Sequence, residues 1–193
     1  GYIDNKIVNV NNFNATNIDY YLSLEGDLSN TSRYIEPFGQ ENVHSFEFAK
    51  ILILACTELE SVLKTICNEV DGNPGGTIAD YKRTILGRYP KIVTAHVSVS
   101  RLGKDIYPFS GWDTGKLVWW NSYQAVKHNR EEAFRDATYW NAVNALSALY
   151  IAIFYLAKVV SFPYNKLYGR YIDSPYCGNH YLLSPDEELP DFV

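Results

Sequence analysis

Apolar side chains recur at helical spacing along residues 42–70. From Leu52 onward they follow one another at intervals of three and four positions, while polar side chains such as Lys50 and Ser61 fall on the opposite side. This pattern predicts an amphipathic helix of about seven turns. Residues 51–54 are apolar on every side of that helix, which predicts that the rest of the chain covers this part completely.

A second long stretch, residues 136–160, is apolar at most positions. Asp136 is placed to cap its start, and Asn144, Ser147 and Lys158 interrupt its most apolar part. A membrane-spanning helix needs about 20 predominantly apolar residues, and these interruptions favour a helix buried in a protein core instead. We therefore expect a core helix and no membrane contact.

Shorter elements are predicted before and after the first long helix. Residues 17–34 have helix-compatible spacing that Gly26 interrupts, which predicts one broken helix or two short ones. A run rich in Gly and Pro, residues 71–76, ends the first long helix. Thr77 and a carboxylate three positions later form a capping-box pattern, which predicts a short helix to about Arg88.

The stretch 91–100 has the alternation of a short β element, whose partner is either the amino-terminal arm, residues 1–15, or the tail. Residues 116–130 have the spacing of a further helix. The last residues, 163–193, are rich in turn-forming residues and predict an extended C-terminal wrap. The fold class is therefore mainly α: a compact helical bundle, with a minor β element.

Composition limits the function without naming it. The 193 residues, 47% of them hydrophobic, suffice for one domain, and a net charge of −5 gives no overall attraction for nucleic acid. Three widely spaced cysteines without a CxxC pair, and no signal-peptide pattern, indicate a reducing, cytoplasmic setting. The four histidines are isolated and no phosphate-loop or dinucleotide motif is present, so we expect no metal and no cofactor.

The segment 116–130 carries the strongest candidate chemistry. At 100° per residue, aromatic rings and a cation share one stripe of its helix: Trp119, Tyr123, Val126 and Arg130. Trp120 and Lys127 lie along its flank. Cations beside aromatic rings can hold a phosphate while a base stacks, so Tyr123 and Trp120 are candidate binding residues. Packing of these rings in the core is the alternative.

Lys127, His128 and Arg130 are the candidate catalytic residues. A histidine can remove a ribose 2′-hydroxyl proton near neutral pH, and neighbouring cations can stabilise the phosphorane that forms. This set is chemically sufficient for RNA cleavage without a metal ion, although such a set is also common on ordinary helices. On an unbroken helix His128 points away from the stripe of Arg130, so the two converge only if the helix ends there.

Glu60 and Lys64 are a further pair of candidate binding residues on the first long helix. They are spaced i,i+4 in the order that stabilises a helix, so a surface ion pair is the simpler interpretation. In the functional interpretation, Glu60 orients Lys127, His128 or Arg130 across a helix interface. That interpretation requires the two helices to be neighbours.

The sequence ACTELESVLK at residues 55–64, followed by WWNSYQAVKHNR at 119–130 and another long helix, resembles the HEPN superfamily. Members are compact helical bundles, and many are toxin or antiphage ribonucleases. These usually dimerise, and an Arg followed after four to six residues by a His, from each subunit, forms a composite site. The local order here is Lys127-His128-x-Arg130, and the resemblance covers roughly residues 42–160.

The resemblance and the residues together imply an HEPN-like homodimer that binds RNA or a nucleotide. They also imply cleavage of RNA without a metal ion, in a defence or toxin setting. The alternative is a non-enzymatic helical interaction module in which Lys127, His128 and Arg130 form salt bridges with a partner protein or a second copy. A solvent-open site favours the first function, and buried, fully paired side chains favour the second.

Overall fold

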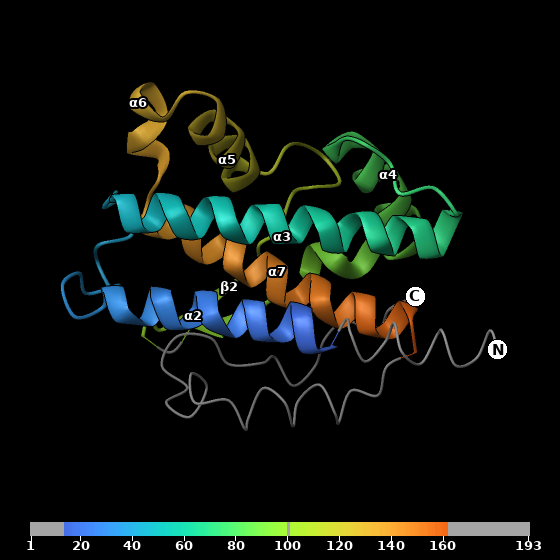
Figure 1. Cartoon of the computed structure of the whole chain (residues 1–193), viewed down its shortest axis with the longest axis horizontal. Helices are drawn as coiled ribbons and strands as arrows, with labels where there is room; N and C mark the ends of the chain where they lie inside the picture. The colour runs from blue at the N-terminus through green and yellow to red at the C-terminus, as the bar shows by residue number, and fades with distance from the viewer. Residues whose placement is uncertain (1–13, 100, 162–193) are drawn as a thin grey trace.

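Two long helices pack along each other through the middle of the protein. The computed structural model describes residues 14–99 and 101–161, in which α3, Phe46–Asp71, lies against α7, Tyr139–Val159 (Figure 1). Both helices agree with the sequence prediction to within a few residues at each end. The described residues form six α-helices and one two-stranded sheet, so the fold is mainly α.

Hydroxyl side chains fix where the two long helices begin. The Ser45 hydroxyl accepts the N–H of Phe48 at 3.1 Å, and the Thr138 hydroxyl accepts the N–H of Asn141 at 3.1 Å. The predicted cap at Asp136 is wrong, because that residue lies in a 3-10 turn and α7 begins three residues later. Thr138 has the extended backbone that an N-cap requires.

Helix α7 is the centre of the hydrophobic core. Every residue from Asn141 to Ala157 is buried, and the first exposed side chain near its end is Lys158. Among the described helices α7 alone is long and apolar enough to cross a membrane, and 89% of its most apolar 18-residue stretch is buried inside the protein. Such burial is what the prediction of a core helix requires.

Helix α2, Asp19–Thr31, follows a π-helical turn, Asn14–Ile18, and packs against α3 and α7. It continues through Gly26, so the predicted break at that residue is wrong. A glycine inside a helix costs about 1 kcal/mol relative to alanine. Burial of Tyr21 and Leu28 on the same helix stabilises it by more than this cost.

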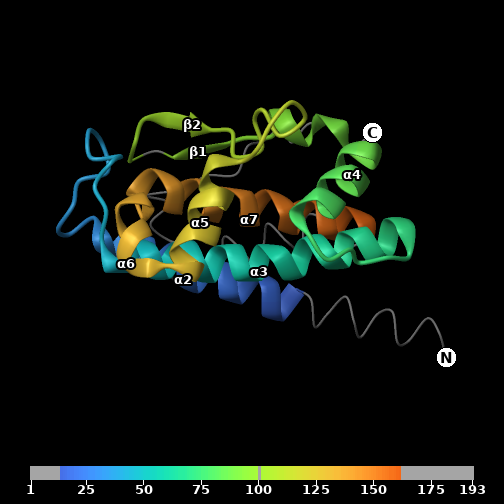
Figure 2. The ribbon, with the colours of Figure 1, turned by 90° about the horizontal axis from the view of Figure 1, so that it is seen from above.

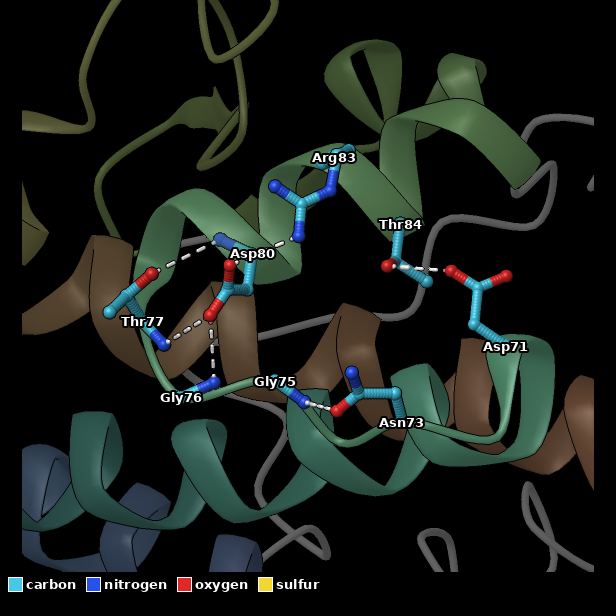
Figure 3. A network of polar contacts seen from close by, with 8 residues as sticks. All are labelled: Asp71, Asn73, Gly75, Gly76, Thr77, Asp80, Arg83 and Thr84. Carbon is cyan, nitrogen blue, oxygen red and sulfur yellow. Dashed lines mark hydrogen bonds and ion pairs between the residues drawn. The ribbon is translucent and has the colours of Figure 1, made fainter.

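A network of polar contacts holds the turn between α3 and α4, Ile78–Arg88 (Figure 3). Gly72 ends α3 with a left-handed φ of 71°. The Thr77 hydroxyl accepts the N–H of Asp80 at 3.3 Å, while the Asp80 carboxylate accepts two backbone N–H groups at 2.9 and 3.1 Å. The predicted capping box is therefore confirmed. We call residues 71–84 the α3–α4 corner.

A short antiparallel hairpin follows α4 and lies on the opposite side of α7 from α2 (Figure 2). Strand β1, Val97–Val99, pairs with β2, Lys104–Ile106, and Gly103 makes their turn with a φ of 63°. The partner of the predicted β element is thus the next strand, which corrects the expectation of the arm or the tail. The first half of 91–100 is instead in a 3-10 helix, Pro90–Thr94, whose proline fixes φ at a helical value.

Three elements link the hairpin to α7. Helix α5, Val118–His128, packs against both α3 and α7. The four-residue α6, Arg130–Ala133, and the 3-10 helix η3, Phe134–Asp136, then lead into α7. The arm up to residue 13 and the predicted wrap, residues 163–193, lie outside the described residues.

Candidate functional site

The aromatic side of α5 fixes this helix to the rest of the protein. Trp119 is buried, and its Nε1 donates a hydrogen bond of 2.7 Å to the carbonyl of Pro108. Trp120 packs edge-on against Tyr123, with ring centroids 5.1 Å apart. Trp120 is 3% exposed and Tyr123 0%, so neither ring offers a face on which a base could stack. We therefore assign both rings to the packing that positions the helix.

The end of α5 places the candidate catalytic residues at the surface. Asn129 leaves the helical conformation, with φ −146° and ψ 82°, so the helix ends at His128 and not at Arg130. Arg130 begins a separate short helix and does not continue the predicted stripe. Lys127, His128 and Arg130 are all exposed. We call residues 127–136 the α5–α6 corner.

Lys127 is the one of these residues that the core positions directly. Its Nζ donates a hydrogen bond of 3.4 Å to the hydroxyl of Tyr123 and lies 5.5 Å from the centroid of that ring. An ammonium group has three donors, so two remain for a ligand. The buried tyrosine thus holds a surface cation in place without being exposed itself.

The side chains of His128 and Arg130 make no hydrogen bond, ion pair or ring contact with any described residue. An imidazole ring can act as a general base or a general acid. A guanidinium presents a planar fork of donors that matches a phosphate. Both groups are therefore free to meet a ligand.

The α5–α6 corner carries as many carboxylates as cations. The charged residues are Lys127, Arg130, Glu131, Glu132, Arg135 and Asp136. This segment therefore does not form the strongly positive field that attracts a long phosphate backbone. Specific contacts with a single phosphate, or with a second copy of the same surface, suit this charge pattern better.

The α5–α6 corner lies beside the start of α3. Phe134 stacks on Phe46, with ring centroids 4.5 Å apart, and meets the ring of His44 edge-on at 4.9 Å. Backbone hydrogen bonds also join the two segments, including one of 3.3 Å from the Ser45 N–H to the Ala137 carbonyl. His44, isolated in the sequence, is therefore an exposed imidazole near the corner. No local pattern could have shown this, because the contact depends on tertiary packing.

One face of α3 next to this contact is open to solvent. Phe46, Lys50 and Leu54 share that face at i,i+4 spacing and are all exposed. Phe46 is 65% exposed and Leu54 39%. The prediction that residues 51–54 are covered completely is wrong at Leu54, because the packing of the protein leaves this side chain partly open to solvent.

Glu60 and Lys64 lie on α3, where Glu60 contacts α4 and not the α5–α6 corner. Lys64 forms an ion pair with Glu60 at 3.8 Å, as the simpler interpretation of the sequence expected. The Tyr81 hydroxyl donates a hydrogen bond of 3.1 Å to Glu60. Burial, and then the charge of Glu60, raises the pKa of Tyr81. Helices α3 and α5 are neighbours, yet the described contacts of Glu60 do not include Lys127, His128 or Arg130.

Other chemistry is limited in the described part of the chain. Burial raises the pKa of Cys56 well above its ordinary value and that of Cys67 to about 11, so neither thiol is a nucleophile at neutral pH. No group of three or more His, Cys, Asp or Glu within residues 14–99 and 101–161 could hold a metal ion. Comparisons with protein-family models, curated proteins and solved structures gave no match.

Proposed function

We propose that this protein binds RNA at the α5–α6 corner and cleaves it without a metal ion, as an HEPN-like protein of a defence or toxin system. The observation that carries the proposal is His128, whose side chain is exposed and has no partner among the described residues, and which lies in the sequence between the exposed cations Lys127 and Arg130. Lys127 and Arg130 supply the donors for one phosphate group. The balanced charge of the corner favours such a local contact over tracking of a long backbone.

The proposed reaction is an attack within the RNA itself. The neutral imidazole of His128 takes the proton of a ribose 2′-hydroxyl, and the 2′-oxygen forms a bond to the adjacent phosphorus. Lys127 and Arg130 stabilise the charge on the pentavalent phosphorane. The bond to the 5′-oxygen then breaks, and that oxygen takes a proton from water or from an imidazolium of a second copy. The products are a 2′,3′-cyclic phosphate and a 5′-hydroxyl.

The test is incubation with end-labelled single-stranded RNA, with and without a chelator. We expect cleavage that the chelator does not change, with products that end in a cyclic phosphate. His128→Ala should lower the rate about 10²- to 10⁴-fold, and Arg130→Ala should weaken both binding and cleavage. Arg33→Ala is the matched control, because Arg33 is also an exposed arginine but lies beyond the end of α2. Absence of both cleavage and binding in the unmodified protein contradicts the proposal.

A second candidate function rests on the open apolar face of α3. Phe46 and Leu54 are exposed next to a corner that carries both signs of charge. In a two-fold dimer each contact occurs twice, so a surface with an apolar centre and mixed charges can pair with itself. In this alternative, Lys127 and Arg130 form salt bridges with carboxylates of a second copy, and the module is not an enzyme.

Measurement of mass in solution separates the two candidates. A dimer that Leu54→Lys or Phe46→Ser converts to monomer supports pairing through this face. Phe38→Ser is the control, since Phe38 is similarly exposed at 67% but lies in the loop before α3. A monomer at every concentration rules out the dimerisation module, and RNA cleavage that survives dissociation shows that one copy suffices for the first function.

A further inference from the structure

A cavity of about 290 Å³ opens between the first turns of α4 and α5. Lys82 and Lys116 both line it, together with apolar side chains that include Ile78, Leu117 and Trp120. A helix rises about 1.5 Å per residue, so the cavity lies roughly 10–15 Å along α5 from His128. It is therefore separate from the α5–α6 corner.

Positive charge is concentrated at this cavity, although the protein as a whole is acidic. Neither Asp nor Glu is among the described residues that line it. The nearest carboxylate on α4, Asp80, already accepts hydrogen bonds from Gly76, Thr77 and Arg83. Asp113 is exposed in the preceding loop and is not a lining residue. The start of α5, which no side chain caps, adds the positive end of its helix dipole.

The two lysines differ in how they are held. Lys82 Nζ donates a hydrogen bond of 3.3 Å to the carbonyl of Gly115, which places its ammonium between α4 and the loop, with two further donors free. Lys116 is exposed and has no partner among the described residues. Leu117 and Trp120 are almost fully buried and so provide a fixed apolar wall.

We propose that this pocket binds a small organic monophosphate. The phosphate lies between Lys82 and Lys116, and the apolar part of the ligand contacts Ile78 and Leu117. A phosphate monoester carries nearly two negative charges at neutral pH, which two ammonium groups balance, whereas a carboxylate carries one. Small-molecule sites occupy about 300–1,000 Å³, so a cavity at the lower limit admits a ligand no larger than a mononucleotide.

The test is titration of the whole protein with phenyl phosphate, inorganic phosphate and benzoate, followed by tryptophan fluorescence. This signal is suitable because Trp112 and Trp120 line the pocket. We expect saturable binding of phenyl phosphate, with a dissociation constant of about 1 mM or below. Inorganic phosphate should bind several-fold more weakly because it lacks the apolar part, and benzoate should do so because it has one charge.

Variants decide whether the signal comes from this pocket. Lys82→Gln and Lys116→Gln should each weaken phenyl phosphate about tenfold, the loss expected for one charge-assisted hydrogen bond. Lys50→Gln, on the open face of α3, and His128→Ala should leave the affinity unchanged. The proposal is overturned by absence of saturation up to about 10 mM, by equal affinity for the two phosphates, or by a loss of binding that follows His128 instead of the lysines. A protein that does not cleave RNA is still expected to bind phenyl phosphate in this pocket, since the two sites use different residues.

Discussion

The α3–α4 corner and the α5–α6 corner are both places where one helix ends and another begins, but they differ in the hydrogen bonding of their polar side chains. In the first, the Thr84 hydroxyl donates to Asp71 at 2.8 Å, and Asp80 accepts hydrogen bonds from the backbone and from Arg83 (Figure 3). In the second, no side chain caps the start of α6, and His128 and Arg130 have no partner among the described residues.

This difference indicates what each corner contributes. Paired polar groups stabilise the turn that contains them, since each replaces a hydrogen bond to water with one inside the protein. Exposed groups without a partner add little to stability, but they can meet a ligand without first breaking another contact. Substitutions in the α3–α4 corner should therefore change the free energy of unfolding, and substitutions in the α5–α6 corner should change activity.

The largest effect is expected from His128→Ala. Loss of a general base should lower the rate of RNA cleavage about 10²- to 10⁴-fold. The free energy of unfolding should stay within about 0.5 kcal/mol, because the side chain is exposed and unpaired. Cleavage assays and urea unfolding on the same preparation measure both. A variant that is strongly destabilised would show that the corner is structural.

Glycine substitutions test the backbone of the α3–α4 corner. Gly72→Ala should lower the free energy of unfolding by about 1 kcal/mol, because alanine is strained at a φ of 71°. The loss should not be larger, since a Cβ there would meet no atom within 4 Å. Gly75→Ala should cost more, since a Cβ there would lie 2.8 Å from the Cβ of Asp80. Gly87→Ala is the control: it lies within α4 in open space and should stabilise by about 0.4–1 kcal/mol. Equal costs at Gly72 and Gly75 in urea unfolding would contradict the packing argument.

Removal of the α4 cap should have a smaller effect. Thr77→Ala loses the hydrogen bond to the N–H of Asp80 and should lower the free energy of unfolding by about 1 kcal/mol. Thr77→Ser keeps the hydroxyl and should lose little. RNA cleavage at 25 °C should be unchanged in both variants. Reduced cleavage in a folded Thr77→Ala protein would show that the two corners are not independent.

The smallest effect is a change in pH dependence. Hydrogen bonds, first from Gly76 and then from Arg83, lower the pKa of Asp80. A group with a lowered native pKa contributes stability above its ordinary pKa, about 3.9, and this is lost as the pH falls toward the lowered value. Asp80→Asn should therefore reduce the loss of stability between about pH 5 and pH 3, measured by urea unfolding. An unchanged slope would show that Asp80 does not titrate in this range.

Local signals explain which parts of the fold the sequence predicts well. The start of the helix from Ile78 to Arg88 is predicted because its capping-box residues are neighbours in the chain. The break at Gly26 is predicted wrongly because the contacts that keep α2 continuous come from α3 and α7. At the candidate site, sequence spacing indicates Lys127 and His128 but not the nearby His44, whose position depends on the contact between Phe134 and the start of α3.

The sequence by itself determined the two long helices, the turn after Gly72 and the segment that holds the candidate catalytic residues. Apolar spacing and capping act over a few residues, so they can be read without knowledge of distant parts of the chain. The tertiary structure alone decided which sides of the helices are open. It buried Trp120 and Tyr123, left His128 and Leu54 exposed, and formed the lysine pocket between α4 and α5. The physical reason is that burial depends on contacts between segments far apart in sequence, which neither spacing nor composition specifies.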